Sequence, residues 1–157
     1  MEILEKQTLE LSNVLSFRGK VTQQELMEKS RELEKIIAQS GAKKNGGACT
    51  ATFAVEQGPG GTLMDMELLI PLDRKISVPD GFTLKEKILL TNALMIRHLG
   101  NPSGMQATVN ALTAYIAEHG LTPITPAYNL TVKDAATPLE LDQVEIDVYV
   151  GISPNIL

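Results

Sequence analysis

Four carboxylates stand in two closely spaced pairs, Asp65 with Glu67 and Glu145 with Asp147. Apolar residues alternate with them, so each pair projects from one face of a predicted strand. Such a row of acids has two interpretations. It forms a solvent-exposed face of a sheet, or it forms an acidic wall that attracts a cation and gains strength only where it is buried. We expect the solvent-exposed face.

The other reactive side chains are too few or too scattered for a catalytic constellation. His98 and His119 are the only histidines, and neither has metal-ligand spacing to another His or Cys. His98 ends a predicted strand and His119 a predicted helix, so we expect structural or surface roles. Cys49 is the only cysteine, and there is no Gly-x-Ser-x-Gly motif. We predict no catalytic residue, no metal site, no cofactor and a protein that is not an enzyme.

Two asparagines interrupt otherwise apolar strand faces at matching positions, Asn13 and Asn92. A buried asparagine needs hydrogen-bond partners. These side chains therefore bond across a pseudo-two-fold axis, or they face a polar cavity. We expect structural bonding, and we keep both residues as candidates for ligand binding.

The elements that would position these residues come from an internal repeat. A shift of 79 residues aligns positions 9–48 with 88–127 without a gap and gives nine identities in forty pairs. Besides the asparagines, Arg18 aligns with Arg97. Hydrophobic periodicity also matches in every element, which makes a chance similarity improbable.

Each repeat begins with an alternating, strand-like segment and continues with a helix. A capping box of Thr22 and Glu25 predicts the start of the first helix, and Gly41 predicts its end. The dipeptide Asn101-Pro102 predicts the start of the second. Residues at helical spacing then follow in each helix, Leu26, Ser30, Leu33 and Ile37 in the first and Met105, Val109, Leu112 and Ile116 in the second.

Two further strands complete each repeat. Residues 48–57 and 63–72 flank the run Gly58-Pro59-Gly60-Gly61, and residues 127–134 and 144–152 flank a longer connection. The glycine run could cradle an anion with its amides. No helix follows it directly, so we predict a hairpin turn.

These elements predict an α+β fold of two tandem β-α-β-β units, residues 8–72 and 87–152, joined by a linker at residues 73–81. We expect pseudo-two-fold symmetry and an antiparallel sheet with two helices packed on it. One helix on three strands leaves much apolar surface uncovered, so we expect a single domain over residues 1–157.

Composition argues against several classes of protein. The net charge is −5, and no Lys/Arg cluster exceeds the pair Lys43-Lys44, which argues against nucleic-acid binding. No apolar stretch approaches the length of a membrane span, and the N-terminus lacks the pattern of a secretion signal. The single cysteine fits a reducing compartment, so we expect a cytoplasmic protein.

The two predicted helices differ in charge. The first is rich in Glu, Lys and Arg, whereas the second carries no charged residue before Glu118. Small residues at helical spacing, which let another backbone approach closely, follow one face of the second helix: Gly104, Ala107, Ala111 and Ala114. We expect this face to be covered, either by the same chain or by a partner such as a second copy.

The order of the elements and their sequences resemble the gyrase-inhibitor-like (GyrI-like) effector-binding family. That family includes the ligand-binding domains of multidrug-responsive transcription regulators. The resemblance covers nearly the whole chain. It is carried by the segments Asp65–Pro71, Arg97–Gly100, Tyr115–Leu121 and Val144–Val150, and by Pro126 at the head of a strand.

The resemblance implies a small-molecule ligand in a groove along the pseudo-two-fold axis. Cation-binding members carry a glutamate soon after the proline of the strand that follows the second helix, where this chain has Tyr128 or Asn129. Tyr149 matches the aromatic residue of the last strand, and Gly151 replaces the family's usual proline. Loss of the acid argues against lipophilic-cation recognition and against the hydrolysis that catalytic members base on it.

We therefore predict a stand-alone effector-binding module without a DNA-binding domain of its own, which would act on transcription only through a partner. Its ligand is a neutral or weakly polar small molecule. The predicted ligand-binding residues are Tyr128, Tyr149, Asn13, Asn92 and Asn129. The alternative is a protein-interaction or accessory module that docks a partner or itself through the second helix.

Overall fold

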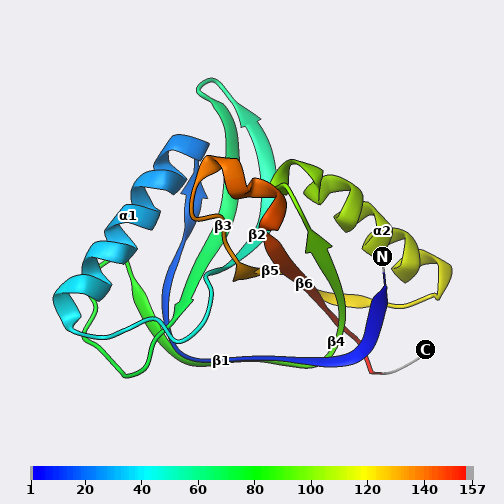
Figure 1. The fold of residues 1–157 in the computed structure, drawn as a ribbon, viewed down its shortest axis with the longest axis horizontal. Coiled ribbons are helices and arrows are strands. Elements are labelled where there is room, and N and C mark those ends of the chain that lie inside the picture. The colour runs from blue at the N-terminus through cyan, green and yellow to red at the C-terminus, as the bar shows by residue number, and fades with distance from the viewer. Residues whose placement is uncertain (1, 155–157) are drawn as a thin grey trace. The chain divides into compact units, whose positions relative to one another are not determined.

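The computed structural model describes residues 2–154 and has an α+β fold of antiparallel strands and helices (Figure 1). The chain divides into two units. The first unit is Glu10–Ile88, and the second unit contains the residues up to Leu9 and those from Leu89 onward. Both divisions fall inside long strands. The expectation of a single domain remains a prediction.

The first unit has the predicted order strand, helix, strand, strand. Its elements are β1 (Ile3–Val21, which begins in the second unit), α1 (Gln23–Ser40), β2 (Cys49–Gly58) and β3 (Gly61–Pro71). β3 lies between β1 and β2 and pairs antiparallel with both. Gly58 pairs with Gly61 across the tight turn, so the predicted hairpin is confirmed.

Helix α1 begins and ends where its sequence predicts. The Glu25 amide donates to the Thr22 hydroxyl at 3.2 Å, and the Thr22 amide donates to the Glu25 carboxylate at 3.0 Å. These two bonds form the capping box, and they lower the pKa of Glu25. Gly41 closes the helix with φ of 79°, a left-handed conformation that glycine adopts without strain.

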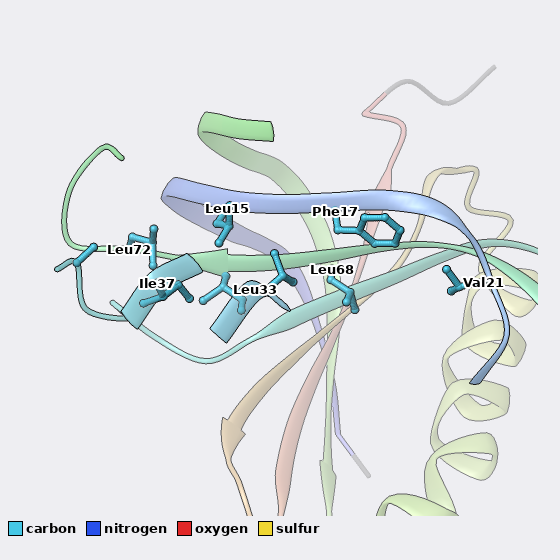
Figure 2. Packing of buried hydrophobic residues seen from close by; sticks show 9 residues of the cluster. Leu15, Phe17, Val21, Leu33, Ile37, Leu68 and Leu72 are labelled. Carbon is cyan, nitrogen blue, oxygen red and sulfur yellow. The ribbon is translucent and has the colours of Figure 1, made fainter. Parts of the chain in front are cut away.

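The core of the first unit lies between α1 and one face of its strands. Leu33 and Ile37 project from the helix toward Leu15 and Leu68 (Figure 2). Burying side chains of this size contributes about 1.5–3 kcal/mol each. The carboxylates of β3, Asp65 and Glu67, alternate with its apolar residues and lie on the opposite face of the strand.

The second unit repeats the same order with two short 3₁₀ additions. Its elements are β4 (Thr83–Leu99, which begins in the first unit), a 3₁₀ turn (Pro102–Gly104), α2 (Met105–Glu118), β5 (Pro123–Lys133), a 3₁₀ segment (Pro138–Gln143) and β6 (Glu145–Ile152). β6 lies between β5 and β4, antiparallel to both. The predicted duplication of elements is confirmed.

The core of the second unit lies between α2 and one face of β4, β5 and β6. Leu112 of the helix packs with Ile96 and Val148 of the strands. Asn101 caps the 3₁₀ turn, because its side chain accepts a hydrogen bond from the Ser103 amide at 3.0 Å. No helix within residues 2–154 is long and apolar enough to cross a membrane.

Candidate functional site

Two of the predicted ligand residues lie opposite each other on neighbouring strands. Tyr128 of β5 pairs with Tyr149 of β6, and Met95 of β4 pairs with Tyr149 on its other side. Paired residues of antiparallel strands share a face, and Val148 next to Tyr149 projects into the core with α2. We name the face that points away from α2 the tyrosine face. Its members are Met95, Arg97, Tyr128, Leu130, Asp147 and Tyr149.

An ion pair between a buried acid and a half-exposed arginine lies on the tyrosine face. The Arg97 guanidinium donates to both oxygens of Asp147 at 2.6 and 2.9 Å, and Asp147 is 4% exposed. The two hydrogen bonds and the Asp147 charge raise the pKa of Arg97. Because the pair is neutral as a whole, the tyrosine face combines aromatic and apolar surface with no net charge from these two side chains.

Glu67 is buried, which corrects the expectation of a solvent-exposed acidic face. The carboxylate is 3% exposed; it accepts a hydrogen bond from the Ser16 hydroxyl at 2.7 Å and pairs with Lys85 at 2.5 Å. Asp147 is the second exception. Each of the two buried carboxylates is paired with a cationic side chain, Glu67 with Lys85 and Asp147 with Arg97, and this pairing compensates the cost of burying the charge.

Asp65 remains nearer the solvent, as the sequence predicts. The Arg18 guanidinium binds its carboxylate at 3.0 and 3.2 Å and stacks 3.5 Å from the centre of the Phe53 ring. This hydrogen bonding lowers the pKa of Asp65. The pair lies at the surface, where ion pairs contribute little to stability.

Cys49 is a buried and inert thiol. It is fully buried on β2, and burial together with the charge of Glu67 raises the pKa of its thiol to about 12. A thiol is nucleophilic only as the thiolate, so Cys49 is no nucleophile at neutral pH.

The two repeated asparagines, Asn13 and Asn92, form different hydrogen bonds, one through the backbone and one through the side chain. Asn13 adopts φ of 51°, and its carbonyl accepts a hydrogen bond from the Leu72 amide at 2.9 Å. Asn tolerates this left-handed conformation better than most residues, and the strand alternation shifts there, so that Val14 and Ser16 are buried besides Leu15. Asn92 instead donates from its side chain to the Ile152 carbonyl at 3.1 Å.

Asn129 lies on the other side of the strands from Tyr128. It pairs with Val148 and therefore projects toward α2, away from the tyrosine face. Its buried Oδ1 atom accepts no hydrogen bond from residues 2–154. A buried acceptor without a donor costs about 1–3 kcal/mol. The structure thus separates Asn129 from the tyrosines with which the sequence groups it.

A cavity in the second unit is lined by one predicted residue, Asn92. Its volume is about 390 Å³, and its lining is Glu5, Lys6, Asn92, Ala93, Leu94, Leu121, Ile152, Ser153 and Pro154. A smaller cavity of about 180 Å³ shares Asn92, Ile152 and Pro154 with it. Sequence reasoning misses Glu5 and Lys6, because they precede the repeat and match no motif. We name the larger space the Asn92 cavity.

Both histidines have structural surroundings. His98 is buried and bonds the Thr108 hydroxyl at 2.7 Å through Nδ1 and the Asn101 carbonyl at 2.9 Å through Nε2. It thereby ties the end of β4 to the start of α2. His119 stacks on Tyr115, with ring centres 3.9 Å apart. Within the described chain, no three His, Cys, Asp or Glu side chains form a group that could hold a metal ion.

The small-residue face of α2 is exposed in this chain. Gly104, Ala107 and Ala114 are exposed, whereas Ala111 packs against the core. The expectation that other parts of residues 2–154 cover this face is therefore wrong for those three positions. Coverage by a partner remains a prediction.

The sequence matches no family model and no curated protein. Solved structures nevertheless share its fold. The crystal structure of the EcmrR C-terminal domain has a TM-score of 0.78 at 11% identity, covering 97% of this chain and 97% of that one. The EcmrR–DNA complex in an EcmrR-RPo assembly has a TM-score of 0.74 at 12% identity; 96% of this chain is covered, and the chain spans 57% of that protein.

Two further relatives by structure carry other descriptions. SAV2435 bound to tetraphenylphosphonium has a TM-score of 0.56 at 12% identity, covering 98% of this chain and 93% of that one. A hydrolase from Listeria innocua has a TM-score of 0.52 at 12% identity, covering 97% and 91%. At such identities the likeness establishes that this chain shares the fold of the EcmrR C-terminal domain, and nothing further.

Proposed function

We propose that this protein is a small-molecule effector-binding module whose ligand lies against the tyrosine face. The observation that carries the proposal is the fold shared with the EcmrR C-terminal domain over 97% of both chains. SAV2435, which has the same fold, was solved with a small aromatic cation bound. Membership of the gyrase-inhibitor-like family is part of the same proposal.

The tyrosine face suits a neutral aromatic or apolar ligand. Tyr128 and Tyr149 offer adjacent rings on paired strands, and Met95 extends the apolar surface. Aromatic rings supply large contact area at a small loss of side-chain entropy. Asp147 adds no free charge because Arg97 already binds both its oxygens.

A panel of neutral aromatic compounds tests the proposal. The chain has three tyrosines and no tryptophan, so ultraviolet-excited emission reports on the tyrosines alone. Binders should change this emission and raise the melting temperature progressively, roughly with the logarithm of ligand concentration above Kd. Tyr128→Leu and Tyr149→Leu should remove the response, whereas Tyr115→Phe should keep it. A panel without any binder, or binders indifferent to both leucine variants, contradicts the proposal.

The exposed face of α2 supports a second candidate function, an interaction module. Gly104, Ala107 and Ala114 are exposed, and the helix carries no charged residue before Glu118. A second copy packed there would give a concentration-dependent dimer in sedimentation equilibrium. Ala107→Arg should then yield a monomer, and Arg31→Ala on the charged helix α1 should leave the dimer intact. A wild-type monomer at all concentrations rules out self-association through this face.

A further inference from the structure

We propose that the Asn92 cavity is a second binding site, separate from the tyrosine face, for a small zwitterion with an apolar body, such as an apolar α-amino acid. Its volume of about 390 Å³ falls in the range of small-molecule sites, about 300–1,000 Å³. One acid, one base, one amide and the serine Ser153 line it together with apolar side chains. A ligand that carries both charges would match this lining.

An unusual backbone conformation brings the acid and the base to the same cavity. Consecutive side chains of a regular strand point to opposite faces, yet Glu5 and Lys6 are neighbours in β1 and both line the Asn92 cavity. Lys6 has φ of 55°, a conformation that L-residues with long side chains rarely adopt. This local twist breaks the alternation and places both charges at one opening.

The acid is held in position by a residue of the helix. Tyr115 of α2 donates from its hydroxyl to Oε1 of Glu5 at 2.9 Å. This hydrogen bond raises the pKa of Tyr115. No side chain within residues 2–154 donates to the second carboxylate oxygen of Glu5, which can accept from an ammonium group, so Tyr115 acts as a positioning residue for the site.

The base has no competing partner within the described residues. Lys6 makes no ion pair or hydrogen bond with any side chain of residues 2–154, and in particular none with Glu5. A carboxylate is the natural partner for this ammonium. A ligand with one ammonium and one carboxylate would satisfy Glu5 and Lys6 together, whereas a singly charged ligand would leave one of them without a partner.

The floor of the cavity selects the body of the ligand. Leu94, Leu121, Ile152 and Pro154 supply apolar surface. Asn92 is fixed by its bond to the Ile152 carbonyl, so its amide keeps a fixed orientation beside that surface. Asn92 shares a face with Leu94, which belongs to the core with α2. The site therefore lies on the side of the strands opposite the tyrosine face.

Calorimetric titration with three probes of one shape tests the inference. Leucine carries both charges, 4-methylpentanoate lacks the ammonium, and 3-methylbutylamine lacks the carboxylate. Leucine should bind, and each analogue should bind at least about tenfold more weakly, the effect of losing one hydrogen bond to a charged group. Equal binding of the three, or no leucine binding up to about 10 mM, overturns the inference.

Matched variants locate the binding. Lys6→Asn removes the charge with a residue that tolerates a positive φ, and Glu5→Gln removes the acid. Each should weaken leucine binding at least about tenfold, and Tyr115→Phe should weaken it less. Lys133→Asn, an exposed change outside the cavity, should leave it unchanged, and circular dichroism melting checks that every variant is folded. If Tyr149→Leu loses leucine binding and Lys6→Asn keeps it, the ligand lies on the tyrosine face. That result overturns the inference about the Asn92 cavity and leaves the proposed function intact.

Discussion

The Ser16 hydroxyl donates a 2.7 Å hydrogen bond to the Glu67 carboxylate, and both residues are buried. Lys85 completes the arrangement at 2.5 Å from the same oxygen, with its side chain 37% exposed. A buried carboxylate without partners is costly, so this cluster is a structural element of the first unit.

Removal of Lys85 should therefore destabilise the protein. Lys85→Met should lower the free energy of unfolding by about 1–3 kcal/mol, less than for a fully buried pair because Lys85 is partly exposed. Adding Glu67→Gln should recover at least about 1 kcal/mol of that loss, measured by urea unfolding as a double-mutant cycle. Lys75→Met, which breaks the exposed pair with Glu86, is the control and should cost under about 0.5 kcal/mol. Additive effects of the two cluster substitutions contradict the account.

The Cys49 thiol should resist modification in the folded protein. With its pKa raised to about 12, only about one thiol in ten thousand is ionised at pH 8, against roughly a quarter for an ordinary cysteine. Ellman's reagent at pH 8 should thus react at the rate of unfolding, and immediately in concentrated urea. Rapid labelling under native conditions would show that Cys49 is accessible.

Gly151 should tolerate no added side chain unless Thr125 changes with it. A Cβ at this position would lie 2.8 Å from Cγ2 of Thr125, and overpacking of this kind costs about 1–3 kcal/mol. Gly151→Ala should lower the melting temperature. Thr125→Ser in the same chain should restore much of it, since serine lacks the methyl group and keeps the hydroxyl. Equal melting temperatures of Gly151→Ala and the wild type would refute the contact.

The same contact explains a departure from the resembled family. The Gly151 amide donates to Oγ1 of Thr125 at 2.9 Å, a bond that the family's usual proline at this place cannot make because it has no N–H group. Thr125 thus requires both the N–H group and the missing side chain of Gly151.

Lipophilic cations should bind poorly. The acid of the tyrosine face is neutralised by Arg97, and burying an unpaired cation costs several kcal/mol. Aromatic faces return only about 0.5–2 kcal/mol each. Tetraphenylphosphonium should therefore bind more weakly than about 1 mM by calorimetry, and neutral triphenylphosphine oxide should bind more tightly. Micromolar tetraphenylphosphonium binding that disappears in Glu67→Gln or Glu145→Gln would show that one of these acids supplies the charge.

The sequence predicts the parts of the fold that depend on local signals. The capping box at Thr22, the helix end at Gly41 and the turn at Gly58 each follow from neighbouring residues, and the structure confirms them. The two arginines that the repeat aligns, Arg18 and Arg97, also occupy equivalent places in the structure. Arg18 pairs in register with Glu67, and Arg97 pairs in register with Asp147. The internal repeat therefore predicts equivalent positions in the two units, which the pattern of a single strand or helix cannot predict.

The features that the sequence does not predict depend on strand order and on backbone conformation. The partners of the buried Glu67, Ser16 and Lys85, lie 51 and 18 residues away in the sequence, so no local pattern of alternating residues reveals its burial. Positive φ angles at Lys6 and Asn13 break that alternation, because each redirects the side chains that follow. The pairing of Asn129 with Val148 likewise depends on register, and it separates Asn129 from Tyr128 across the strands.

The central claim is that a small-molecule ligand contacts Tyr128 and Tyr149, and one titration tests it most directly. The tightest neutral binder from the aromatic panel is titrated by calorimetry into the wild type, Tyr149→Leu and Tyr115→Phe. The account predicts a loss of at least about tenfold in affinity for Tyr149→Leu, as for a residue at the centre of a contact. It predicts wild-type affinity for Tyr115→Phe. Unchanged affinity in Tyr149→Leu would contradict the account.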